Sequence, residues 1–94
     1  MDVVDNAERN RLEAVVDGHL ARLDYVVKDG RLLVEHTVVP DELEGQGLGG
    51  TLVAAAVDKA RAAGLAIVPH CSFTRSWLER HPDGHDGVEV DWAG

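Results

Sequence analysis

A chain of 94 residues, of which 45% are hydrophobic, can build one domain with a modest core and is too apolar to be disordered. Its net charge of −8 disfavours nonspecific binding to nucleic acid or to an anionic membrane, because both would repel it. The single cysteine, Cys71, excludes an intrachain disulfide. We therefore expect a single domain over residues 1–94, with no nucleic-acid or membrane partner.

Targeting signals are not visible in this sequence. Residues 1–5 contain no basic segment, and no stretch approaches the roughly 18 consecutive apolar residues of a membrane-spanning helix. A cytoplasmic location is the expectation. The apolar content suits a monomer or a weak dimer, because no exposed apolar stripe is evident.

The first half of the chain predicts an antiparallel three-stranded meander. Apolar residues alternate with polar ones along residues 11–16, 19–27 and 32–39, which is the period of a strand. Asp17-Gly18 is a dipeptide typical of a two-residue hairpin turn, and residues 28–31 form the second turn.

The same alternation predicts which side chains share a face. On the third strand these are Leu32, Val34, His36 and Val38. Tyr25, on the second strand, is expected in the core. Residues 1–7 are expected to be loop-like, with Val3 and Val4 as candidates for a short edge strand.

After Pro40, which cannot donate to a strand ladder, the apolar spacing becomes that of a helix. The three- and four-residue intervals run from Leu48 to Ala60, and Gly64 is the expected residue just after the helix. Residues 65–68 read as a short, fully apolar central strand. Because strand, helix and strand make a right-handed crossover, this strand should run parallel to the third.

A second, shorter helix is expected to follow that strand. Ser72 is its predicted N-cap, and Pro82 ends it. Its predicted inner face consists of Phe73, Trp77 and Leu78. Residues 83–94 are expected to be loop-like, with residues 88–90 as a candidate strand.

The glycine-rich segment before the first helix favours an anion site, since it leaves backbone N–H groups uncovered at a positive helix end. A nucleotide P-loop is excluded because Gly50 is followed by Thr51 without the required lysine. Residues 45–50 have the glycine spacing Gly-x-Gly-x-x-Gly that is typical of the dinucleotide-binding fold. However, that fold needs an acidic residue after the next strand and repeated βαβ units, whereas this chain has one crossover ending in residues 68–70.

A third interpretation of the phosphate site depends on four sequence segments taken together. They are His36-Thr37-Val38-Val39-Pro40, Glu44-Gly45-Gln46-Gly47-Leu48-Gly49, Pro69-His70-Cys71-Ser72-Phe73 and Glu79-Arg80-His81-Pro82. In this order they resemble the small GNAT-like N-acetyltransferases, over roughly residues 8–83. The resemblance implies a minimal α/β (α+β) GNAT-like fold that keeps the cofactor-binding half. It also implies acetyl-CoA or CoA as co-substrate, no metal, and an amine acceptor, either a small amine or a protein lysine.

The resemblance also implies roles for individual residues. The end of the third strand, at Thr37, Val38 and Val39, would pair with the pantetheine amides. The pyrophosphate would lie on Gly45, Gln46, Gly47, Leu48, Gly49, Gly50 and Thr51. Glu44 departs from the larger superfamily, which usually has Arg or Gln there, and its carboxylate would repel a pyrophosphate.

The resemblance implies that the thioester lies near Cys71, which is the predicted catalytic residue. It follows a buried strand and begins a helix, where the helix dipole lowers a thiol pKa. It could act as a general acid toward the leaving thiolate or as a nucleophile. A small buried cysteine without a catalytic role is the alternative.

Other polar residues are weaker candidates. His36 and His70 could supply a base, although a structural role is favoured for both. The His- and Asp-rich residues 81–86 lack zinc-ligand spacing, so no metal site is expected. Besides an N-acetyltransferase, the sequence allows a CoA-binding or sensing module without turnover, or an interaction domain whose loop binds no ligand.

Overall fold

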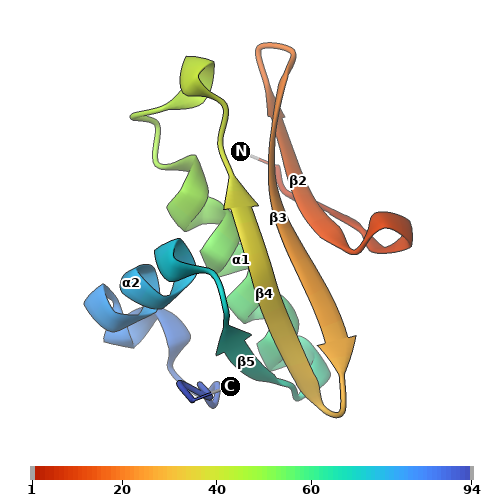
Figure 1. The fold of residues 1–94 in the computed structure, drawn as a ribbon, viewed down its shortest axis with the longest axis vertical. Helices are drawn as coiled ribbons and strands as arrows, with labels where there is room; N and C mark the ends of the chain where they lie inside the picture. The colour runs from red at the N-terminus through yellow and green to blue at the C-terminus, as the bar shows by residue number, and fades with distance from the viewer. Residues whose placement is uncertain (1, 94) are drawn as a thin grey trace.

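The computed structural model describes residues 2–93. One five-stranded sheet has the order β1-β2-β3-β4-β5, with α1 against one face and α2 beside β5 (Figure 1). The strands are β1 Val4–Asn6, β2 Arg11–Val16, β3 His19–Lys28, β4 Arg31–Val38 and β5 Ala66–Pro69. The helices are α1 Leu48–Ala63 and α2 Ser72–Arg80, and short 3₁₀ turns are η1 Ala7–Arg9, η2 Asp41–Leu43 and η3 Pro82–His85.

The predicted topology of the sheet is confirmed. Strands β2, β3 and β4 form an antiparallel meander, and β5 pairs parallel to β4. Asp17 and Gly18 both have positive φ, at 52° and 78°, as a type I′ hairpin turn requires. The predicted α/β arrangement therefore consists of one meander and one βαβ crossover.

The core lies between α1 and the sheet. The helix buries one stripe, made of Leu48, Leu52, Val53, Ala56, Val57 and Ala60. It packs on Leu23, Leu32 and Ile67, all fully buried. Gly64 ends α1 in the left-handed conformation, at φ 68°, as predicted.

A β-bulge interrupts the pairing of β3 with β4. Asp24 pairs with His36, but the next residue, Tyr25, pairs with Val34. Glu35 is thus an extra residue on β4 with no counterpart on β3. A bulge of this kind bends its strand and increases the local twist.

The bulge reverses the faces of the end of β4. Leu32 and Val34 are buried, as predicted, but His36 and Val38 are exposed. Thr37 instead faces inward, where its hydroxyl lies 3.3 Å from that of Thr74. The expectation that residues 32, 34, 36 and 38 share one face is wrong, because one inserted residue breaks the two-residue period.

Short pairings form at both ends of the chain, at or next to the candidate strands at Val3 and Val4 and at residues 88–90. Residues 4–6, in the predicted loop-like segment 1–7, form β1 and pair with β2. In the predicted loop 83–94, Val90 forms a single parallel bridge with Ile67. The edge strands β2 and β5 offer backbone donors and acceptors that these segments satisfy. Residues 1 and 94 lie outside the described residues.

Helix α2 begins one residue away from its predicted cap. Cys71 is the N-cap, and Ser72 is the first helical residue. Leu78 is buried as predicted, together with Thr74, four residues before it. Phe73 is 40% exposed, contrary to the prediction, because the 74/78 stripe faces the core instead.

Neither helix within residues 2–93 is long and apolar enough to cross a membrane.

Candidate active site

Strands β4 and β5 pair over a short distance and then part. Their last pair is Val34 with Pro69. Beyond it, the backbone N–H groups of His70 and Cys71 both donate to the carbonyl oxygen of Val34, each at 3.1 Å. β4 continues to Val38, whereas the chain after β5 turns into α2 (Figure 1). Within the described chain, the end of β4 therefore has no β5 neighbour.

Cys71 lies at this parting, in contact with both sides of it. It is half-buried, and its Sγ lies 3.6 Å from the Oγ1 of Thr37 on β4. The Thr37 hydroxyl lies 3.3 Å from that of Thr74, which is fully buried in the first turn of α2. The thiol is thus grouped with two hydroxyls and a helix N-terminus.

This environment makes the Cys71 thiol more acidic. Burial is the largest single influence and raises the pKa. The backbone N–H groups of Thr74 and Phe73 and the hydroxyls of Thr37 and Thr74 stabilise the thiolate, and together they hold the pKa below its ordinary value. The helix dipole favours the thiolate in the same way.

The glycine loop borders a shallow cavity of about 260 Å³ at the start of α1. The cavity is lined by Val39, Leu43, Glu44, Gly45, Gly47, Leu48, Gly49, Gly50 and Phe73. The first bond of the helix runs from the N–H of Thr51 to the carbonyl of Gly47, at 3.1 Å. The N–H groups of residues 48–50 precede this bond and have no acceptor within the helix. They are the donors that an anion at a helix N-terminus uses.

Other residues of the predicted phosphate loop are placed differently. Gln46 is exposed and does not line the cavity. The Thr51 hydroxyl donates to the carbonyl of Gly47 at 3.1 Å, so both of its donors are used inside the first turn. Val39 lines the cavity, whereas Val38 is exposed on the other side of β4. Glu44 is exposed and borders the same cavity as the glycines.

Two aromatic residues of α2, the helix that begins at Cys71, lie against the first turn of α1, which follows the glycine loop. A Cβ atom on Gly49 would lie 2.7 Å from the ring Cζ of Phe73, and one on Gly50 would lie 2.7 Å from Nε1 of Trp77. The close approach of α2 therefore requires glycine at both positions. In the sequence, the four-residue spacing of Phe73 and Trp77 predicts a core face and does not indicate this contact with the two glycines.

The two candidate bases differ in position. His70 Nδ1 lies 3.2 Å from Oε2 of Glu35, the bulge residue, at the parting of the strands. His36 is exposed on the solvent face, opposite Asp24. Tyr25 is buried, as expected, and its hydroxyl donates to Asp5.

Two histidines near the C-terminus lie within hydrogen-bond distance of backbone carbonyl oxygens. His81 Nδ1 lies 2.8 Å from the carbonyl of Trp77, and His85 Nε2 lies 3.0 Å from that of Leu78. Over residues 2–93, no three His, Cys, Asp or Glu residues gather in a way that could hold a metal ion.

Comparisons with known proteins show the family of this chain. Residues 11–87 match the family model described as GCN5-related N-acetyl-transferase. The NMR solution structure of a GCN5-like candidate N-acetyltransferase from Staphylococcus aureus is similar, with a TM-score of 0.73 and 30% identity. That likeness covers 98% of this chain and 91% of the other. A search of curated proteins finds no match. The chain belongs to the GCN5-related N-acetyltransferase family.

Proposed function

We propose that this protein transfers an acetyl group from acetyl-CoA to an amine, with Cys71 beside the thioester. The observation that carries the proposal is the acidic Cys71 thiol, held against Thr37 where β4 and β5 part. Family membership supports acetyl transfer in general. The identity of the co-substrate and the role of Cys71 are the parts that we add.

The residues present fit coenzyme A. The N–H groups of Leu48, Gly49 and Gly50, which have no acceptor within α1, offer a site for a pyrophosphate beside a cavity of about 260 Å³. The end of β4, at residues 37–39, is where an extended pantetheine arm would find strand-like backbone partners. Glu44 is the unfavourable feature, because its carboxylate borders the same cavity.

The chemistry needs a proton acceptor and a proton donor. Acetyl-CoA supplies a thioester whose carbonyl carbon bonds to the acceptor nitrogen as its bond to sulfur breaks. We assign the proton donor to Cys71, which protonates the departing CoA thiolate. The resulting Cys71 thiolate is stabilised by the hydroxyls of Thr37 and Thr74.

His70 is the base that we assign to the acceptor amine. It precedes Cys71, and Glu35 lies 3.2 Å from its ring, so an imidazolium formed there would be stabilised. His70 takes one proton from the amine nitrogen, and Cys71 gives one to CoA. Both residues return to their starting states through solvent, and the net products are an amide and CoA thiol.

Thermal shift with CoA, acetyl-CoA and NAD⁺ tests the co-substrate. Stabilisation by the two CoA species and not by NAD⁺ is expected, and no shift with CoA would contradict the proposal. Thiol release from acetyl-CoA over an amine panel then tests turnover. A CoA-induced shift without any thiol release would identify a CoA-binding or sensing module instead.

The role of Cys71 is tested with Cys71→Ala and Cys71→Ser, with Ser72→Ala as an exposed neighbouring control. We expect both Cys71 variants to slow thiol release about 10²-fold, as for loss of a general acid, and Ser72→Ala to keep the native rate. Unchanged rates in both Cys71 variants would remove the thiol from the chemistry. Mass spectrometry of the protein after mixing with acetyl-CoA alone should find no acetyl group on Cys71, whereas an acetylated thiol would identify a nucleophile.

A further inference from the structure

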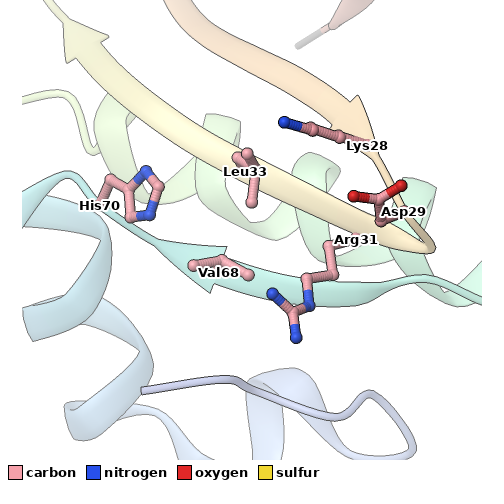
Figure 2. A pocket seen from close by; sticks show the side chains of 6 residues that line it. All are labelled: Lys28, Asp29, Arg31, Leu33, Val68 and His70. Atoms are coloured by element: carbon pink, nitrogen blue, oxygen red, sulfur yellow. The ribbon is translucent and has the colours of Figure 1, made fainter. Parts of the chain in front are cut away.

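A second cavity, of about 250 Å³, lies on the face of the sheet that α1 does not cover (Figure 2). Leu32 and Ile67 are fully buried on the α1 side. Their neighbours, Leu33 and Val68, therefore point to the opposite face, where they lie side by side in the β4–β5 pair. These two side chains form an apolar floor, in which Leu33 is half-buried and Val68 is buried.

Charged groups stand at one end of this floor, beside the β3–β4 turn (Figure 2). Lys28, Asp29 and Arg31 line the cavity there. Over residues 2–93 the Lys28 ammonium has no ion-pair partner within 4.0 Å, and in Figure 2 it extends over the sheet, away from Asp29. The Nη2 atom of Arg31 lies 3.7 Å from Oδ2 of Asp91. An anion resting on the floor would therefore meet the Lys28 ammonium, with Asp29 as the opposing charge.

The other end of the cavity reaches the parting of β4 and β5. His70 lines it there, while the adjacent Cys71 contacts Thr37 on the α1 side. Glu35 lies 3.2 Å from His70, and its carboxylate would attract an ammonium ion. An elongated ligand could thus place an amine at His70 and an anion at Lys28.

We propose that this cavity is the acceptor subsite, and that it selects a primary amine joined by a short apolar chain to a carboxylate. The inference rests on the proposed acetyl transfer, because it assigns the second substrate of that reaction. Arg31 and Glu35 are four residues apart, or about 13 Å along the strand. The side chains of Lys28 and Arg31 shorten this span, so that about five methylene groups fit between the two charged ends.

Three acceptors of equal length test the charge preference. They are 6-aminohexanoate, hexylamine and 1,6-diaminohexane, which differ in an anionic, neutral or cationic far end. We expect kcat/KM for 6-aminohexanoate to exceed that for hexylamine about tenfold, in line with one charge-assisted contact that is partly exposed. The diamine should be the poorest acceptor. Equal values for the three would overturn the proposal.

Two neighbouring variants of opposite charge test the residues. Lys28→Gln should raise KM for 6-aminohexanoate about tenfold, whereas Asp29→Asn should lower it. Asn tolerates the left-handed conformation that Asp29 adopts, at φ 53°, so the turn should survive. Both variants should change KM for hexylamine less than KM for 6-aminohexanoate, because hexylamine has no anionic end, and Arg9→Gln is the control for loss of one surface charge elsewhere.

Binding can be measured separately from turnover. Titrating 6-aminohexanoate into ¹⁵N-labelled protein should shift the amides of Leu33 and Val68 in a saturable way, and Lys28→Gln should weaken this binding. Acetylation of hexylamine with no such shift would overturn the subsite and leave the proposed function intact. Saturable shifts without acetylation of any amine would contradict the proposed function, and the acceptor role of this cavity would fail with it.

Discussion

The Cys71 thiol and the Thr37 hydroxyl lie 3.6 Å apart, although 34 residues separate them in the chain. Thr37 faces the thiol because the bulge at Glu35 reverses the faces of the last part of β4. Without the extra residue, His36 would take the inward position. The same bulge therefore sets both the shape of β4 at its parting from β5 and the chemical surroundings of Cys71.

The first prediction concerns this contact. Thr37→Val removes a hydroxyl that stabilises the thiolate, so the pKa of Cys71 should rise. The rate of iodoacetamide alkylation, which follows the thiolate, should then shift to higher pH. Thr51→Val is the control, because that hydroxyl bonds to Gly47 instead. An identical pH profile for native protein and Thr37→Val would show that the hydroxyl does not act on the thiol.

The second prediction concerns the carboxylate beside the glycine loop. Glu44→Gln removes a negative charge from the cavity where we place the pyrophosphate. The Kd for CoA, measured by calorimetry, should fall roughly 3- to 5-fold at low salt and less at high salt, because exposed charges are screened. Glu42→Gln changes the same charge in η2, outside the cavity lining, and should have a smaller effect. Equal changes in the two variants would point to a general charge effect.

The third prediction separates strain from ligand binding. Gly47 and Gly64 flank α1 in the left-handed conformation, at φ 73° and 68°. Gly47→Ala and Gly64→Ala should each lower the free energy of unfolding by about 1 kcal/mol, since a Cβ atom disfavours this conformation. Only Gly47→Ala should also weaken CoA binding. Chemical denaturation and calorimetry on both variants provide the comparison, and equal Kd values would argue against a role for the loop.

The fourth prediction concerns Asp5, which links β1 to the core. Lys59 Nζ lies 2.6 Å from its carboxylate, and the Tyr25 hydroxyl also donates to it. Burial raises the pKa of Asp5, but the hydrogen bonds from Lys59 and Tyr25 and the charge of Lys59 outweigh it and lower the pKa below 3.8. A group with a lowered native pKa stabilises the fold above its unfolded pKa and loses that effect as the pH falls through the native one.

Asp5→Asn should therefore lower the urea midpoint at pH 7. The difference from native protein should shrink at a pH below the ordinary carboxyl range, where Asp5 of the native protein is also protonated. Asp83→Asn, an exposed position in η3, is the control for loss of one carboxylate. If the difference in urea midpoint between native protein and Asp5→Asn stayed constant down to acidic pH, the charge of Asp5 would not be the source of its effect on stability.

Local patterns in the sequence were sufficient for much of the fold. The meander, the limits of α1 near Leu48 and Gly64, and the parallel final strand all follow from periodicity, turn residues and the handedness of a crossover. Each of these depends on residues close together in the chain. The glycine loop is likewise a local pattern that indicates an anion site, whereas the resemblance to the small GNAT-like N-acetyltransferases implied the place of Cys71 beside a thioester.

The arrangement around the site depended on contacts between distant segments. The bulge at Glu35 is a mismatch between two strands, and neither strand alone carries a signal for it. Phe73 lies outside the buried 74/78 stripe of α2, and its ring lies against Gly49 of α1, a contact that helical spacing does not predict.

The open-face cavity has the same origin. Lys28 and His70 belong to segments that are far apart in the chain, and only the pairing of β4 with β5 brings them to one surface. The sequence by itself determined which elements form and which residues could bind an anion or carry a thiol. Only the tertiary structure decided that Thr37 and not His36 faces Cys71, because strand register is a property of two strands together.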